Sequence, residues 1–149
     1  MNELHVSLGE QVSFSKTVAE SDVYLFAGIT GDFSVNHVNE EYMKGTIYGK
    51  RIVHGALLVG FISTTSTMLI ERSVARGTEE TAVSLGYDGI RFLKPVFLGD
   101  TITVTYTVEK IDTTARRSWS KVEIANQRGE LVTVGQHLLK WTSNKVPHR

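Results

Sequence analysis

Two kinds of hydrophobic spacing divide the chain. The first half has helical spacing, whereas from Thr81 onward apolar and polar residues alternate as in β-strands. A first helix is predicted after Ser21, a residue type favoured at helix N-caps, and before Gly31, which ends it. The face of this helix that turns inward is formed by Val23, Phe26, Ala27 and Thr30.

The other elements of the first half are a strand, a loop and two helices of very different length. Residues 12–18 alternate as a strand, residues 32–39 are expected to form a loop, and residues 40–44 form a short helix. The most apolar segment predicts a long helix over residues 55–72. Its run of hydroxyl residues makes it too polar for a bilayer span, so we expect it to be buried in protein.

The second half predicts four strands, over residues 81–92, 101–108, 118–125 and 131–141. Asp88-Gly89 shifts the alternation by one position, which predicts a β-bulge. One long apolar helix followed by antiparallel strands predicts an α+β fold, in which a curled antiparallel sheet wraps around the helix in a hot-dog arrangement. Such a sheet leaves an edge open, and a second copy of the chain can cover it, so we expect a homodimer.

Composition and charge narrow the function classes. The chain has 149 residues with 41% hydrophobic content, as expected for a single domain over residues 1–149. The absence of cysteine excludes disulfides, cysteine-ligated metals and thiol nucleophiles. Sixteen Lys and Arg balance sixteen Asp and Glu, which argues against nucleic-acid or membrane partners. Residues 1–9 lack an apolar core, so we expect no secretory peptide and a cytoplasmic location.

Asp32 and His37 are the first candidate for acid–base chemistry. On a helix their spacing would turn them about 140° apart, so they can meet only if the intervening segment is a loop. A carboxylate and an imidazole that meet at one point can exchange protons near neutral pH. The alternative is structural, because an aspartate after a glycine often closes a turn and a histidine before a helix often packs.

The segment His54-Gly55 is the second candidate. Gly55 is at the predicted start of the long helix, where backbone N–H groups have no partner within the helix and can bind an anion or a carbonyl oxygen. Ser63 follows about two turns later on the same helix. The alternatives are that Gly55 only allows close packing and that the hydroxyl of Ser63 bonds a carbonyl of its own helix.

The order of these segments resembles the MaoC-like dehydratases, and within them the R-specific enoyl-CoA hydratases, over nearly the whole chain. The matching segments are residues 22–32, His37, Tyr42, residues 52–55 and residues 91–100. The resemblance implies that Asp32 and His37 are the hydration pair and that the Gly55 N–H binds the thioester oxygen. It also implies that Ser63 supports the pair and that His54 belongs to the substrate-binding segment. No cofactor and no metal are expected.

One departure from the family pattern lies between the two catalytic candidates. Ser34-Val35 stands where the family commonly has Asn-Pro, which removes a polar contact and a conformational stiffener. This change leaves the substrate preference open. Asn36 is a candidate to replace the polar contact.

The sequence therefore predicts a hydro-lyase that adds water to a 2-enoyl thioester, or removes it from a 3-hydroxyacyl thioester, in fatty-acid metabolism. Coenzyme A is the expected carrier, and its phosphates would need basic residues such as Lys50, Arg51 and Arg91. Two alternatives remain at this point: a hot-dog acyl thioesterase, and a non-catalytic subunit that binds acyl thioesters.

Overall fold

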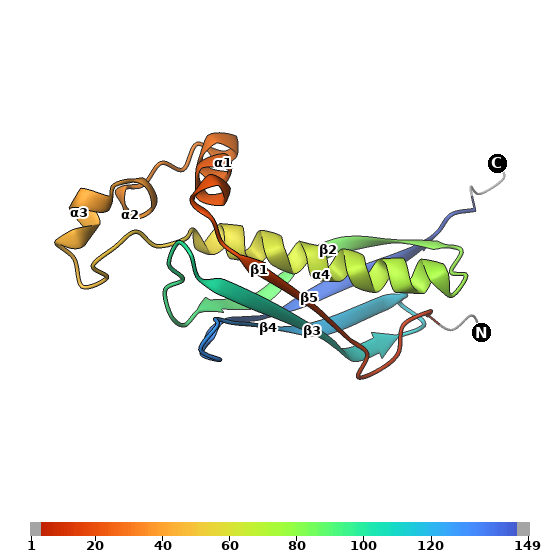
Figure 1. Cartoon of the computed structure of the whole chain (residues 1–149). Helices are drawn as coiled ribbons and strands as arrows, with labels where there is room; N and C mark the ends of the chain where they lie inside the picture. Colours follow the sequence, from red (N-terminus) through yellow and green to blue (C-terminus); the bar gives the residue numbers. More distant parts are fainter. Residues whose placement is uncertain (1–3, 146–149) are drawn as a thin grey trace.

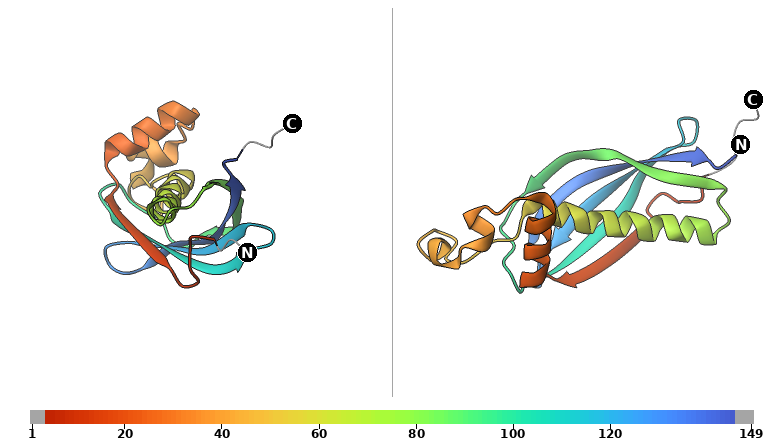
Figure 2. Two further views of the ribbon diagram at one scale, coloured as in Figure 1. Left: turned by 90° about the vertical axis from the view of Figure 1, so that its right-hand side faces the viewer. Right: turned by 90° about the horizontal axis from the view of Figure 1, so that it is seen from above.

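The computed structural model describes residues 4–145 and contains a five-stranded antiparallel sheet with one long helix along its inner face (Figure 1). The elements are β1 (Gln11–Thr17), α1 (Glu20–Thr30), α2 (Val35–Val38), α3 (Glu40–Lys44), α4 (Gly55–Ala75), β2 (Glu80–Phe92), β3 (Thr101–Asp112), β4 (Arg117–Ala125) and β5 (Leu131–Ser143). The strand order is β1-β3-β4-β5-β2. Seen along the helix, the sheet curls around α4, which confirms the predicted hot-dog arrangement (Figure 2).

Alternation of residues in the central strands builds the core. Ile102, Val104, Tyr106 and Val108 of β3 are all buried, while the threonines between them are partly exposed. The helix α4 packs against β1 and β3, so its inner residues, such as Ile62 and Leu69, are fully covered. Burial of apolar surface of this kind stabilises a fold by about 25 cal/mol per Å². No helix within residues 4–145 has the length and hydropathy of a membrane span.

Helix α1 begins two residues earlier than its sequence predicts. The N-cap is Ala19 rather than Ser21, and the Asp22 carboxylate accepts a hydrogen bond of 2.8 Å from the Ala19 N–H. A carboxylate in the first turn satisfies a free donor and also suits the helix dipole, so an N-cap hydroxyl is not needed. The end is as predicted, since Gly31 takes a left-handed conformation with φ of 82°.

The predicted loop at residues 32–39 is partly wrong. Residues 35–38 form the single helical turn α2, with Ser34 as its N-cap. The Ser34 carbonyl accepts hydrogen bonds from the N–H groups of His37 and Val38. Of the predicted loop, Asp32 to Ser34 and Asn39 remain irregular.

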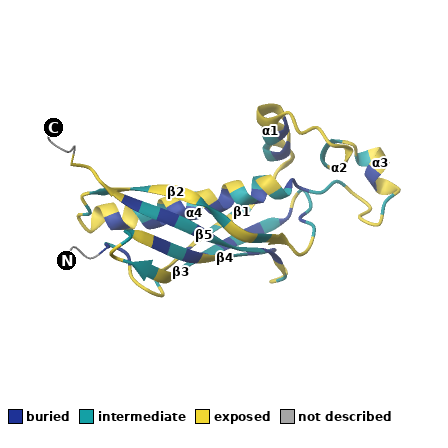
Figure 3. Ribbon diagram, turned by 180° about the vertical axis from the view of Figure 1, so that it is seen from behind, coloured by how far each residue is buried: buried dark blue, intermediate teal, exposed yellow. Residues whose placement is uncertain are grey.

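Strand β2 is one of the two edges of the sheet and is more irregular than predicted. Its register with β5 shifts twice, between Ser84 and Gly86 and between Asp88 and Arg91, so a second bulge joins the predicted one. The first shift turns Leu85 to solvent and places Ser84 and Tyr87 on the inner face, beside His137. No residue of β2 is buried, which Figure 3 shows as a strand without dark blue segments.

Candidate active site

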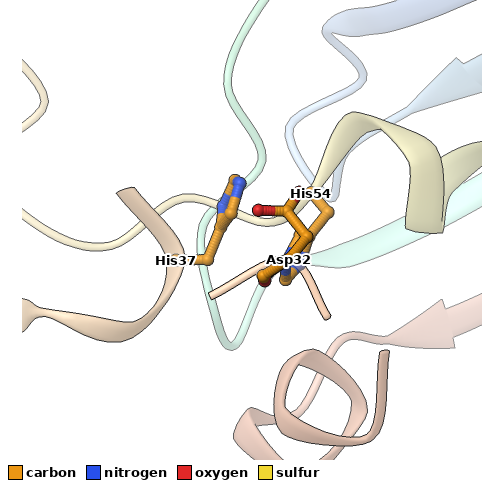
Figure 4. Close-up of side chains that lie close together, drawn as sticks. All are labelled: Asp32, His37 and His54. Atoms are coloured by element: carbon orange, nitrogen blue, oxygen red, sulfur yellow. The ribbon is translucent and has the colours of Figure 1, made fainter. Parts of the chain in front are cut away.

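The helices α1, α2 and α3 form an overhang beyond the N-terminus of α4 (Figure 1). This overhang carries Asp32 and His37, while His54 and Gly55 lie where the chain enters α4. Figure 4 shows that Asp32, His37 and His54 come from separate segments of the chain and lie close together. The structure therefore brings together the two catalytic candidates and one of the substrate-binding candidates.

His37 is held in a defined orientation by the segment before α4. Its Nδ1 lies 2.7 Å from the carbonyl oxygen of Ile52, and a carbonyl can only accept, so Nδ1 carries the proton in the neutral ring. The Ile52 N–H in turn donates to the Asn36 carbonyl. These two bonds tie α2 to the entry of α4. They leave the His37 Nε2 with a lone pair that is available as a base.

Asp32 is exposed and presents its carboxylate beside this imidazole (Figure 4). Oδ1 accepts a hydrogen bond of 3.2 Å from the Ser34 N–H, and the Asp32 N–H donates to the Thr30 hydroxyl. One carboxylate oxygen thus fixes the turn before α2. The other oxygen remains available to a water molecule or a substrate.

His54 lies against both catalytic candidates. Its side chain is 1% exposed, and its Nε2 lies 3.0 Å from the backbone carbonyl of Asp32, so Nε2 is the donor. The ring stacks on His37 with a centroid distance of 3.7 Å and also contacts Phe26. His54 therefore holds Asp32 by its backbone and His37 by its ring, and its place in the substrate-binding segment stays a prediction.

The same three residues are the candidate metal ligands. One ligand atom from each of Asp32, His37 and His54 lies within 4.8 Å of the other two. The two imidazoles, however, are stacked with an angle of 27° between their planes. Ring nitrogens bind a metal through lone pairs in the ring plane, and nearly parallel stacked rings do not direct these lone pairs to one point. The cluster is better suited to hydrogen bonding than to metal binding.

Gly55 is the first residue of α4, as predicted. Its N–H finds no acceptor among residues 4–145, as expected at the start of a helix. The ring of Phe92 lies directly over it, because a Cβ on Gly55 would come within 2.6 Å of the ring. The glycine therefore permits close approach of β2 and also leaves a free donor at the same place. Phe92 was not singled out in the sequence.

The structure does not bring Ser63 to the pair. Ser63 is exposed and lies on the outer side of α4, two turns from Gly55. The buried serine of this part of the helix is Ser66, whose hydroxyl donates to the Ser63 carbonyl. Within the described chain Ser63 makes no side-chain hydrogen bond to Asp32 or His37, and its support of the pair stays a prediction.

Arg51 braces the overhang and is not free for a phosphate group. It donates to the Glu20 carboxylate of α1 at 2.7 Å and to the Glu40 carboxylate of α3 at 2.9 Å. These hydrogen bonds hold the pKa of both carboxyls below their usual range. Lys50 lies over the Phe97 ring, while Arg91 is exposed. Of the three basic candidates, Arg51 is thus a structural residue.

The Ser34-Val35 departure is accommodated by α2. Val35 is the first residue of that helix, a position at which proline is favoured but not required. Asn36 is exposed and contributes its backbone carbonyl rather than its side chain. The pair of Asp32 and His37 therefore forms without the Asn-Pro sequence.

Comparison with known proteins gives a consistent result. The family model described as a MaoC like domain matches residues 4–130. An (R)-specific enoyl-CoA hydratase of Rhodospirillum rubrum is 43% identical over 100 residues, which are 67% of this chain and 64% of that relative. The match thus spans somewhat less than two thirds of that relative's length.

Solved structures agree with the family model. An (R)-hydratase from A. caviae superposes with a TM-score of 0.80 at 25% identity, over 91% of this chain and 96% of that chain. A thioesterase superfamily member from Thermus thermophilus has a TM-score of 0.64 at 16% identity, over 96% of this chain and 87% of that one, and shares the fold alone. The chain belongs to the MaoC-like domain family.

Proposed function

We propose that this protein is a hydro-lyase that adds water to 2-enoyl thioesters of coenzyme A and removes it from the 3-hydroxyacyl products. The observation that carries the proposal is the placement of the His37 Nε2 lone pair and the Asp32 carboxylate next to the free N-terminus of α4. The sequence relationship to (R)-specific enoyl-CoA hydratases supports it.

In the proposed reaction Asp32 and His37 hold one water molecule between them. His37 takes a proton from this water through Nε2 as the oxygen attacks Cβ of the substrate. The electrons of the double bond move toward the thioester carbonyl, and a proton returns from the pair to Cα. General acid–base catalysis of this kind contributes about 10²–10⁴ in rate.

The Gly55 N–H supplies the third requirement, stabilisation of the charge on the thioester oxygen. The dipole of α4, a helix of 21 residues, adds to the effect of the free N–H. A donor aimed at a developing oxyanion is typically worth about 10²–10³ in rate. The Phe92 ring over this position excludes water from one side.

The experiment that tests this function is incubation with crotonyl-CoA, with the absorbance of the conjugated enoyl thioester and the free thiol followed in parallel. Loss of absorbance without thiol release is the expected result. Thiol release would instead identify a thioesterase. Neither signal, with binding of the thioester retained, would identify a non-catalytic binding subunit.

We also propose that the protein acts as a homodimer. The edge strand β2 has unpaired backbone groups and no buried residue, and it exposes Val83, Leu85 and Phe92. Open strand edges associate readily, and a second copy covers such an edge symmetrically. Light scattering is expected to give twice the chain mass of 16.6 kDa, whereas an active monomer at micromolar concentration would contradict the proposal.

A further inference from the structure

A second group of hydrogen-bonded side chains lies on the inner face of the sheet, away from Asp32 and His37. At its centre is His137 of β5, which is fully buried. Its Nε2 lies 2.7 Å from the Ser84 Oγ of β2, and its Nδ1 lies 2.8 Å from the Tyr106 hydroxyl of β3. The ring of Tyr87 stacks on the imidazole with a centroid distance of 4.4 Å.

Strand β4 adds one more polar side chain to this group. Ser120 stands directly opposite His137 in the register of β4 and β5, and its hydroxyl is buried. Four neighbouring strands thus each place polar groups at one level of the inner face. We call Ser84, Tyr87, Tyr106, Ser120 and His137 the His137 cluster. Polar groups in a core are costly unless hydrogen-bonded, so this cluster needs an explanation.

The paired strands β2 and β5 run from the candidate active site to the His137 cluster. Phe92 covers Gly55 and stands opposite Thr133 of β5. His137 is four residues further along β5, which is about 13 Å at the rise of a strand. Between these points Ile90 fills the space left by Gly135, because a Cβ there would meet the Ile90 side chain at 2.4 Å.

Strand β2 is open to solvent beside the cluster. The helix α4 packs against β1 and β3, whereas β2 has no buried residue, and Ser84 itself is exposed. Tyr87 is half-buried, and its ring stacks on His137. An acyl chain that starts at Gly55 and follows the inner side of β2 would therefore meet Ser84 and Tyr87.

We propose that Ser84 and Tyr87, backed by His137 and Tyr106, bind an uncharged hydrogen-bonding group, a hydroxyl or a ketone, on the acyl chain of the substrate. The group would lie about 13 Å from the thioester, as estimated from the strand rise. This inference rests on the proposed function, since it assumes that the thioester binds at Gly55. It assigns a substrate class, acyl thioesters with a polar distal group.

The charge of the cluster favours an uncharged ligand. Burial lowers the pKa of His137 to about 4, so its ring is neutral at neutral pH. The cluster contains no lysine or arginine that would pair with a carboxylate. A neutral imidazole between two hydroxyls can donate from one nitrogen and accept at the other. The donors and acceptors in this chain of hydrogen bonds can exchange roles. Ser84 can therefore act as donor to a ketone or as acceptor from a hydroxyl.

The test compares pairs of 2-enoyl-CoA substrates of equal length, from hexenoyl to dodecenoyl, that end in a methyl or in a hydroxyl group. At one chain length, kcat/KM is expected to be at least about tenfold higher for the hydroxyl-ended substrate. A tenfold ratio corresponds to about 1.4 kcal/mol. Ser84→Ala and Tyr87→Phe should each reduce this preference, while hydration of crotonyl-CoA, which is too short to reach the cluster, stays unchanged.

Ser13→Ala is the matched control, because Ser13 is exposed on β1 and makes no side-chain hydrogen bond to the described residues. It should leave the preference intact. The inference would be overturned if, at every chain length, methyl-ended substrates were hydrated as efficiently as hydroxyl-ended ones. A hydroxyl preference that survives both Ser84→Ala and Tyr87→Phe would also overturn it. If the wild-type protein also failed to hydrate crotonyl-CoA, the proposed function would be overturned, and the inference with it.

Discussion

The molecule contains two stacked pairs of aromatic rings that each include a histidine, and the surroundings of the two pairs differ. In the pair of His37 and His54, the His37 Nε2 has no hydrogen-bond partner among residues 4–145, and the exposed Asp32 lies close by. In the pair of His137 and Tyr87, both imidazole nitrogens are hydrogen-bonded to side chains. A ring with a free nitrogen can accept a proton from a bound water, whereas the His137 ring is buried and bonded to two protein hydroxyls. We therefore propose catalysis at the first pair and binding at the second.

The largest expected effect comes from removing proton transfer at the first pair. Asp32→Asn and His37→Gln should each lower kcat for crotonyl-CoA by about 10²–10⁴, the usual size of an acid–base contribution. Asp32→Asn keeps the shape of the side chain and His37→Gln keeps a polar side chain of similar length, so the melting temperature should stay near that of the wild type. Near-wild-type turnover in both variants would show that the first pair is not catalytic and would remove the difference between the two pairs.

The donor beside the first pair is tested by Gly55→Ala. The new methyl would displace the Phe92 ring and crowd the thioester, so we expect turnover to fall by about tenfold or more. The melting temperature should change little, because alanine suits a helix and Phe92 is 53% exposed and free to move. Gly55→Ala with Phe92→Ala is the control for crowding by the ring. A destabilised variant with undiminished turnover would remove Gly55 from the site.

His54 is expected to act through the groups it holds. His54→Leu removes the donor to the Asp32 carbonyl and should lower kcat by about tenfold, with KM nearly unchanged. His54→Gln keeps an N–H at the position of Nε2, so it should recover most of the activity. Equal loss in both variants would mean that the imidazole itself is required, which would make His54 more than a positioning residue.

The smallest expected effect concerns the pH dependence of stability at the second pair. The pKa of His137 is lowered by burial to about 4, against 6.5 for an unfolded chain, so the unfolded state binds more protons as the pH falls from 6.5 to 4. Folding stability should drop over this range by at most about 3 kcal/mol, and no further through this group below pH 4.

The variant His137→Gln isolates this term, since glutamine can form hydrogen bonds but does not titrate. Its free energy of unfolding, measured by urea denaturation from pH 7 to 4, should fall less steeply than that of the wild type. Identical slopes in both proteins would show that His137 is not held neutral in the folded state.

Most of the fold follows from the spacing of apolar residues. The alternation in β3 and β5 predicts strands because one face of each is buried, and the apolar segment before β2 predicts α4. The start of α1 was missed because the Asp22 carboxylate replaces an N-cap hydroxyl. The helix α2 was missed because a single turn is too short to show a period.

The candidate site was predictable only where local sequence determines it. Asp32 and His37 lie between two helices that the sequence predicts, and Gly55 lies at the start of a third, whereas the bond from His54 to the Asp32 carbonyl joins segments 22 residues apart. The exposure of Ser63 was not predictable, because spacing alone does not tell which side of an apolar helix faces outward. His137 is in phase with Leu139 and Trp141, and this inward position was the signal that marks it as a buried histidine.

The most direct measurement of whether Asp32 and His37 work as one unit is a double-mutant cycle on kcat for crotonyl-CoA. If both residues hold the same water, the variant with Asp32→Asn and His37→Gln should be no slower than the slower single variant, within about threefold, because either change already disables the pair. Multiplicative losses in the double variant, with the fold intact, would show that the two residues act independently and would contradict catalysis by a shared water.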